Sequence, residues 1–432
     1  MSLDAGRDAG TVASRPRRGL RHHPDFRLLW AGQSVSLVGS AVSFVALPLV
    51  ALLVLHVDAF HMGVLTAVER LPPLVVGPLA GPLADRGSRL RLMVVADAGR
   101  ALLLAWIPVG AVLGRLAFWH LVVIAFGVGA LTLLFNVAYP AFLPNVIPAQ
   151  RLAEGNSKLA ASQSAAEVTG SGLASLLIAA GGPPLGVLAD ALSYVVSCWC
   201  LLRLRTRDAA RPAAVPTALR DRLAGFRDDV RSGFPLLWRD RVLRTVTVSN
   251  AILAFFAQLQ AAIYFIFLVR TLHLGPGLIG ALFLIAGGVG FLAAIWCDRL
   301  AARIGVGPLL VTGQVILVAG GTLLAVAGGP TLLAGTAIVA GEACFGAGLS
   351  LFGVGFTTLF QLRAADEVRG RLIGTSRFLT SASVPVAAVL GGVIGVAVSV
   401  RVVMVAGAVG MALGLVAVLR RRVLAVRGVP GP

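Results

Sequence analysis

The sequence predicts an all-α integral membrane protein with twelve transmembrane helices, arranged as two pseudo-symmetric six-helix bundles. The 432-residue chain is 57% hydrophobic and only 13% charged, with a mean hydropathy of +0.90. A soluble domain of this size does not need so much apolar surface. Apolar runs of about 20 residues, long enough to cross a bilayer as a helix, occupy nearly the whole chain. A charged turn that follows one apolar run recurs about half a chain later, as duplication of a six-helix unit predicts.

The apolar runs define the expected helices, and the polar stretches between them define the domains. In the first half we expect helices at about 28–55, 62–80, 90–113, 117–140, 158–180 and 185–203. In the second half we expect them at about 242–269, 276–297, 306–327, 331–358, 372–396 and 399–419. The predicted domains are a disordered basic tail at 1–26, bundles at 27–204 and 242–419, a linker at 205–241 and a tail at 420–432.

The linker contains a pattern typical of an amphipathic helix. Apolar residues recur there at spacings of four and three, at Leu219, Leu223, Phe226, Val230, Phe234 and Leu237. Most arginines of this segment fall on other faces of such a helix. We therefore expect a helix that lies on the inner membrane surface and joins the two halves; a site for a regulatory partner is the alternative.

The distribution of positive charge predicts the orientation of the chain. Of the 37 Lys and Arg residues, 31 fall in the tails and loops on one side of the twelve-helix topology and three on the other. Cytoplasmic loops carry such an excess, so both termini are expected in the cytoplasm. The net charge of +18 is then explained by topology and by contact with anionic lipid, and a nucleic-acid partner is not needed.

A glycine-rich charged turn lies between the second and third apolar runs. Its residues are Gly81, Leu83, Ala84, Asp85, Arg86, Arg89 and Arg91, and the second half has a counterpart in Asp298, Arg299 and Arg303. This pattern resembles the loop between the second and third helices of the major facilitator superfamily. The resemblance implies a cytoplasmic gating loop in which Asp85 meets the positive N-terminal end of the eleventh helix near Arg371. Residues 232–244 resemble the segment that leads into the seventh helix of exporters related to macrolide and enterobactin efflux proteins. The loop at residues 361–371 also resembles that exporter group.

The residues that the chain lacks narrow the class of function. The single lysine, Lys158, is not in a phosphate-binding loop motif, so the chain has no ATP-driven motor of its own. No His-Glu-x-x-His motif occurs, and the four cysteines fall in apolar runs as small packing residues. We expect no cofactor, no metal and no enzymatic activity.

Carboxyl groups inside the apolar runs are candidates for proton coupling, because a charge at mid-depth is costly and is retained for a reason. Glu342 lies near the middle of the tenth expected helix, which lines the central cavity in the resembled family, and Glu167 lies within the fifth. Glu69 precedes Arg70 in the second helix and is a third candidate. For Glu342 and Glu167 the alternative is a neutral glutamic acid that only ties two helices together. Glu69 and Arg70 either neutralise each other or reach separate partners. Asp97 and Arg100 are one turn apart and are expected to form a structural pair.

Polar side chains within the apolar runs are candidates for the substrate cavity. They are Gln33, Ser36, Arg70, Asn136, Asn250, Gln258 and Tyr264. Hydrogen bonds between helices explain such residues equally well.

Together these observations predict a multi-pass transporter of the cell membrane that exports drug-like or secondary-metabolite compounds by proton antiport with alternating access. We expect it to be a monomer. An uptake carrier for a small solute is one alternative, and a sensor or assembly subunit that has lost transport is another.

Overall fold

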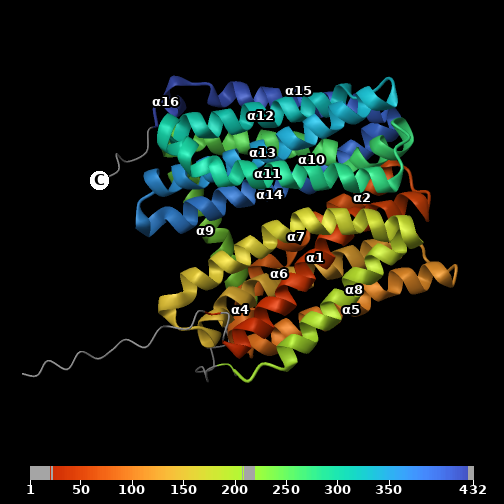
Figure 1. Ribbon diagram of the computed structural model, residues 1–432. Helices are drawn as coiled ribbons and strands as arrows, with labels where there is room; N and C mark the ends of the chain where they lie inside the picture. The colour runs from red at the N-terminus through yellow and green to blue at the C-terminus, as the bar shows by residue number, and fades with distance from the viewer. Residues whose placement is uncertain (1–19, 21–22, 207, 209–218, 427–432) are drawn as a thin grey trace, which may run out of the picture.

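The computed structural model describes residue 20 and residues 23–206, 208 and 219–426, and these residues form helices joined by short turns (Figure 1). The first half contains α1 (Pro24–Leu53), α2 (Ala59–Arg70), α3 (Pro72–Val75), α4 (Gly77–Arg86), α5 (Arg89–Val112), α6 (Phe118–Val146), η2 (Ala149–Arg151), α7 (Leu152–Gly181) and α8 (Pro183–Leu202). The second half contains α9 (Leu219–Arg239), α10 (Arg241–Ile266), the π-helical η3 (Phe267–Thr271), α11 (Pro276–Ile304), α12 (Val306–Val326), α13 (Thr331–Arg363), α14 (Asp366–Ala397), α15 (Val400–Val418) and α16 (Arg421–Leu424). No strand occurs in the described residues.

Nine helices in the described part of the chain are long and apolar enough to cross a membrane: α1, α5, α6, α8, α10 with η3, α12, α13, α14 and α15. The protein is therefore an all-helical, multi-pass membrane protein.

The second expected helix is interrupted. A single helix was predicted over 62–80, but α2 ends at Arg70 and is followed by the short helices α3 and α4. Pro72, Pro73 and Pro78 lack the N–H that an internal helical hydrogen bond requires, and their rings crowd the preceding turn. By contrast, α6 continues through Pro140 and Pro144 to Val146.

Helix starts follow local capping chemistry. Ser88 accepts a hydrogen bond from the backbone N–H of Arg91 at the start of α5. The carboxylate of Asp240 accepts hydrogen bonds from the N–H groups of Val242 and Leu243 at the start of α10. Each cap satisfies backbone donors that a helix leaves without a partner at its first turn.

The two halves meet most closely where α2 packs on α14 and α7 packs on α11. Gly63 on α2 faces Gly392 on α14, and a Cβ at position 63 would lie only 2.6 Å from the carbonyl oxygen of Ala388. The backbones can approach this closely only because glycine stands at the contact. Figure 1 shows α2 next to α14 at the end of the molecule opposite α9 and α16.

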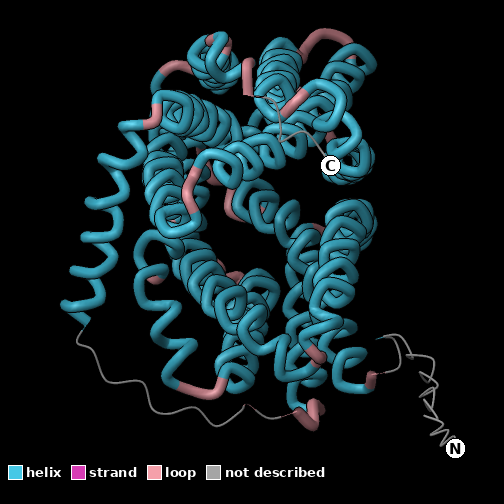
Figure 2. Tube along the Cα trace, turned by 90° about the vertical axis from the view of Figure 1, so that its left-hand side faces the viewer, coloured by secondary structure: helices cyan, strands magenta, loops and turns pink. Residues whose placement is uncertain are grey.

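The hydrophobic core differs between the two ends of the molecule. At the end that carries the turns at 54–58 and 272–275, one cluster of buried residues joins both halves and includes residues of α1, α10, η3, α14 and α15. At the end that carries α9 and α16, which Figure 2 views along the helices, the buried residues form separate clusters, each made of residues from one half. The halves are therefore held together at one end and are packed independently at the other.

Candidate functional site

A cavity of about 670 Å³ lies between the two halves. Helices of the second half provide most of its wall, and α1, α2 and α3 complete it. The lining is formed by Phe44, Arg70, Pro73, Asn250, Leu253, Ala254, Ala257, Gln258, Gln260, Ala261, Tyr264, Phe265, Phe283, Leu317, Leu324, Glu342, Phe345, Leu349, Phe352, Ser381, Val384 and Met404. A largely apolar cavity of this size with a few polar groups is typical of a small-molecule site.

Glu342 provides the carboxyl group of this cavity. It lies near the middle of the 33-residue α13 and is half-buried, because one side of it faces the cavity. The phenol ring of Tyr264 lies beside it and also lines the cavity. Glu342 forms no ion pair with any described residue. Its charge is therefore balanced by no basic side chain in the described part of the chain.

The wall formed by α10 carries three of the predicted substrate-cavity residues. Asn250, Gln258 and Tyr264 follow a helical spacing that puts them on the face turned to the cavity. The amide of Asn250 donates a hydrogen bond of 3.2 Å to the hydroxyl of Thr380. The Gln258 amide nitrogen is buried and has no hydrogen-bond partner among the described residues, so it is free to bind a ligand. The Tyr264 hydroxyl is also buried and lies next to the carboxyl group of Glu342.

Aromatic rings connect the two halves across the cavity. Phe44 of α1 meets Phe283 of α11 edge to face, with ring centroids 5.8 Å apart, and Phe265 of α10 stacks on the same Phe283 at 5.8 Å. Sequence analysis did not single out these rings, or Phe345 and Phe352. Apolar residues in apolar runs carry no signal that separates a cavity wall from a lipid-facing side, so only the packing reveals them.

Arg70 provides the basic group of the cavity. It ends α2 in the first half, is exposed to the cavity, and forms no ion pair or hydrogen bond with the described residues. Its neighbour Glu69 is half-buried and does not line the cavity. The cavity thus presents one acidic and one basic side chain, from different halves, that are not paired with each other.

The other predicted polar candidates lie away from this cavity. Glu167 is exposed on α7 and accepts a hydrogen bond of 3.3 Å from Gln163. Asn136 is exposed on α6. On α1, the hydroxyl of Ser36 donates to the backbone carbonyl of Gln33, whose own side-chain oxygen is buried without a partner.

The predicted gating loop is held by a residue that sequence analysis missed. Asp208 accepts hydrogen bonds from the hydroxyl of Ser88 and from the backbone N–H of Leu90, at 3.1 Å for the latter. Arg89 donates to the backbone carbonyl of Ala141. These contacts fix the turn between α4 and α5.

For several residues of the predicted gating loop, the structure gives few or no side-chain contacts. The side chains of Asp85, Arg86 and Asp298 lie outside the described part of the structure, so their predicted contacts stay predictions. Gly81 belongs to α4 and Arg91 to the first turn of α5. The guanidinium of Arg299 lies 5.0 Å from the ring centre of Trp296.

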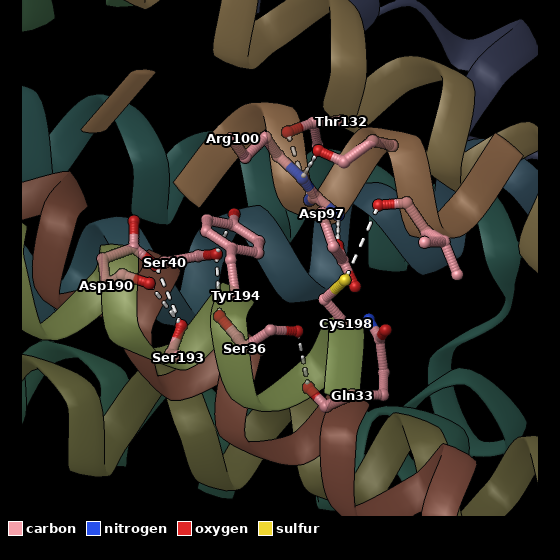
Figure 3. A network of polar contacts seen from close by, with 12 residues as sticks. Gln33, Ser36, Ser40, Asp97, Arg100, Thr132, Asp190, Ser193, Tyr194 and Cys198 are labelled. Carbon is pink, nitrogen blue, oxygen red and sulfur yellow. Dashed lines mark hydrogen bonds and ion pairs between the residues drawn. The ribbon is translucent and has the colours of Figure 1, made fainter. Parts of the chain in front are cut away.

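The predicted pair of Asp97 and Arg100 is confirmed and belongs to a larger buried network inside the first half (Figure 3). Arg100 also reaches Thr132 of α6 at 3.4 Å, and its guanidinium lies 4.1 Å from the ring centre of Tyr194. The Tyr194 hydroxyl is 2.8 Å from that of Ser40. The network therefore ties α1, α5, α6 and α8 together.

Asp190 lies at one edge of this network and is almost fully buried. It accepts a hydrogen bond of 3.2 Å from Ser193 on the next turn of α8. A Cβ at Gly39 of α1 would lie 2.6 Å from its carboxylate oxygen, so glycine is needed for the two helices to approach. None of the residues of this network lines the cavity.

Comparisons of the sequence with known proteins agree on one family. The sequence model of the Major Facilitator Superfamily matches residues 29–384. An uncharacterized MFS-type transporter, YfiS of Bacillus subtilis, is 34% identical over 82 residues, which are 19% of this chain and 20% of that protein. Macrolide efflux protein A of Streptococcus pyogenes is 26% identical over 172 residues, 40% of this chain and 42% of that protein. The matches thus span less than half the length of these relatives.

Solved structures with the same fold are also transporters. A variant of the nucleoside transporter NupG matches with a TM-score of 0.75 and 12% identity, over 91% of this chain and 99% of that one. A bacterial homologue of the iron transporter ferroportin, in its inward-facing state, matches with a TM-score of 0.72 and 16% identity, over 93% of this chain and 98% of that one. At these identities the likeness shows the fold alone. The family match identifies a transporter and not an enzyme, and the chain belongs to the Major Facilitator Superfamily.

Proposed function

We propose that this transporter exports drug-like or secondary-metabolite small molecules across the plasma membrane by proton antiport. The observation that carries the proposal is the position of Glu342 in the wall of a largely apolar cavity, where its carboxyl group has no basic partner among the residues that the structure describes. The similarity to macrolide efflux protein A over 172 residues supports the direction of transport.

The cavity suits an amphipathic organic molecule. Five phenylalanines offer flat apolar contacts, and the Gln258 amide nitrogen and the Tyr264 hydroxyl offer polar groups. The first has no partner among the described residues, and the second lies beside Glu342. Polar groups that lose water without gaining a partner are costly, so a ligand that satisfies them gains affinity. A volume of about 670 Å³ is within the range of drug-sized sites.

Glu342 is proposed to carry the coupled proton. In the protonated form it is neutral and compatible with an apolar wall; after release of the proton, the bare carboxylate needs a compensating charge or water. A cationic substrate would supply that charge directly, so substrate and proton would occupy the site in turn. Glu167 and Glu69 are the remaining candidates for this role, and their positions outside the cavity wall favour Glu342.

Alternating access is proposed to open and close the cavity from the two sides. Arg270 of η3 donates hydrogen bonds to the backbone carbonyls of His56 and Val57, at 3.3 and 2.8 Å, and so links the halves at the end where the core is continuous. We take this end as the outer side, because the arginine-rich segments lie at the other end. The described conformation then faces the cytoplasm, and export would require the contacts of Arg270 to break and the gating loop near Asp85 to close.

The proposed topology has twelve membrane spans in two six-helix bundles, 27–204 and 242–419, joined by a cytoplasmic linker at 205–241, with both terminal tails in the cytoplasm. Besides the nine apolar helices, α7 and α11 are 30 and 29 residues long, and α2 to α4 together cover the second span. The helix α9 lies where the linker helix is expected, and its Gly233 packs against α14. We further propose a monomer in contact with anionic lipid.

The proposal is tested by expression in an efflux-deficient bacterium that is screened against a panel of antibiotics and dyes. We expect the wild-type protein to raise the tolerated concentration of some amphipathic compounds, and Glu342→Gln to be inserted in equal amount without doing so. Greater sensitivity of the wild-type strain would indicate an uptake carrier instead. Binding without any change in tolerance or flux would indicate a sensor or assembly subunit.

A further inference from the structure

A strongly basic pocket lies outside the central cavity, at the end of the molecule that carries α9 and α16. Two adjoining hollows, of about 490 and 340 Å³, share Arg241 and Arg422 in their walls. Arginines from four segments line them: the end of α9, the start of α10, the end of α13 and the start of α16. They are Arg239, Arg241, Arg244, Arg363, Arg420, Arg421 and Arg422.

The single acidic residue of this pocket is already engaged. Asp240 forms an ion pair with Arg363, with 2.9 Å between the guanidinium and carboxylate atoms, and also caps α10. The guanidinium groups of the other six arginines form no ion pair or hydrogen bond with the described residues. Six like charges around one pocket repel each other unless an anion lies between them.

The packing of the last helix holds these arginines in place. Val423 of α16 is buried in the core of the second half, and the N–H of Gly307 donates a hydrogen bond of 2.9 Å to the carbonyl of Val426. A Cβ at Gly307 would collide with the carbonyl of Val423. The segment therefore docks firmly on the start of α12, next to α16 in Figure 1, and presents Arg420 to Arg422 to the pocket.

We propose that this pocket binds the headgroup of an anionic phospholipid. Guanidinium groups bind phosphoryl oxygens through paired, charge-assisted hydrogen bonds, so several arginines around one pocket match a phosphodiester. The bound lipid would bridge α10 and α16, which come from opposite ends of the second half in sequence.

The position of the pocket favours a lipid over a soluble phosphate. It lies where the apolar helix α10 begins, at Arg241, and where the apolar helix α15 ends, at Val418. Phe234 and Trp238 of α9 stack at 4.4 Å and are both exposed, just before Arg239. Exposed aromatic rings beside arginines are typical of the membrane interface, where lipid headgroups lie.

The test uses the purified full-length protein in a non-ionic detergent. Short-chain phosphatidylglycerol, phosphatidylcholine with the same chains, and inorganic phosphate are titrated separately, and apparent affinity is taken from the rise in unfolding temperature. The pocket variant combines Arg420→Gln, Arg421→Gln and Arg422→Gln. The control combines Arg27→Gln, Arg203→Gln and Arg205→Gln, which remove the same charge from basic positions outside the pocket. A second pocket variant, Arg241→Gln with Arg244→Gln, approaches the same site from α10.

We expect phosphatidylglycerol to stabilise the wild-type protein more than phosphatidylcholine does. Its affinity should fall by about fivefold for each arginine removed, or about a hundredfold in the triple pocket variant and less in the double variant, while the control triple changes by less than about twofold. Equal losses in pocket and control variants would overturn the site, since general surface charge would then explain the binding. Equal stabilisation by phosphatidylcholine would also overturn it, and inorganic phosphate acting as strongly as phosphatidylglycerol would overturn the assignment to lipid.

Discussion

Two carboxyl groups within the membrane region, Asp97 and Glu342, have opposite surroundings. Asp97 is fully buried inside the first half and is paired with Arg100, which also contacts Thr132 and the ring of Tyr194. Glu342 faces a cavity, lies beside the phenol of Tyr264 and has no basic partner in the described chain. Both positions are costly for a charge, but only at Asp97 is the cost offset by fixed contacts within the protein.

This difference separates a structural acid from one that can exchange its proton. A buried carboxylate that is paired with a cation and shielded from water cannot readily exchange a proton, and breaking its ion pair is costly. A carboxyl group on a cavity wall can be reached by water or substrate and can change its charge as the cavity is filled or emptied. The predictions below probe this contrast, beginning with the largest expected change in stability.

The largest effect is expected from removing the cation of the buried network. Arg100→Met leaves Asp97 without its partner and also removes a positive charge that interacts with Asp190, so it should destabilise the protein by about 3–5 kcal/mol. Glu342→Gln breaks no ion pair and should cost less than about 1 kcal/mol. Thermal unfolding of both purified variants, together with the yield of monodisperse protein, measures the difference.

A double variant provides the control for this prediction. Adding Asp97→Asn to Arg100→Met removes the uncompensated charge and should restore part of the lost stability. If Arg100→Met proves as stable as Glu342→Gln, the network is not held by its charges and the contrast drawn above is wrong.

A smaller effect is expected in the second half, which is held by neutral polar contacts. Ser249 of α10 donates a hydrogen bond of 2.8 Å to the carbonyl of Gly414 and accepts one of 2.9 Å from the fully buried Gln314. Ser249→Ala leaves the Gln314 amide unsatisfied and should cost about 1–2 kcal/mol in unfolding free energy. The matched control is Thr322→Ala, which removes an exposed hydroxyl bonded only within its own helix. Equal losses in the two variants would show that the buried position of Ser249 is unimportant.

How much of the fold and of the candidate site could be predicted from the sequence depends on the kind of feature. Apolar runs located the membrane helices well, because a span of hydrocarbon fixes both length and composition. They missed the break after Arg70, although Pro72 and Pro73 signalled it. Glu342 was favoured because it lies near the middle of its helix and because that helix lines the cavity in the resembled family. Glu167 also lies well inside its helix, but it is outside the cavity wall.

Features that depend on contact between segments far apart in the chain could not be predicted from any local sequence pattern. The basic pocket joins residues 239–244 with residues 420–422, and nothing in either stretch alone indicates that they meet. The aromatic contact of Phe44 with Phe283 is of the same kind. Asp208, which holds the gating turn, was read only as part of a polar linker.

The smallest effect is expected at Asp240, a paired acid outside the membrane spans. Although burial raises its pKa, hydrogen bonds from Leu243, Arg363 and Val242 and the charge of Arg363 together lower the pKa below its usual 3.8. A lowered pKa in the folded state adds stability at higher pH, and that stability is lost as the pH falls through the lowered value. Because the pair is partly exposed, Asp240→Asn should cost less than about 1 kcal/mol near pH 7.

The pH dependence tests the origin of this small contribution. The stability gap between wild type and Asp240→Asn should be constant at pH values well above the usual pKa of 3.8 and should close as the pH falls through the lowered pKa of the folded state. Unfolding temperatures of both proteins measured across this range provide the comparison. A gap that does not change with pH would mean that helix capping alone, which asparagine preserves, accounts for the behaviour of Asp240.

The most direct test of the central claim measures uphill transport in proteoliposomes with and without an imposed pH gradient. Wild type, Glu342→Gln and Glu167→Gln are compared, each with a substrate found by the antibiotic and dye panel. Glutamine keeps the size and hydrogen-bonding ability of glutamate but cannot release a proton. We expect Glu342→Gln to retain downhill exchange and to lose accumulation driven by the gradient, while Glu167→Gln accumulates substrate like the wild type. Accumulation by Glu342→Gln at the wild-type level, with loss in Glu167→Gln, would place the coupling site on α7 and contradict the account.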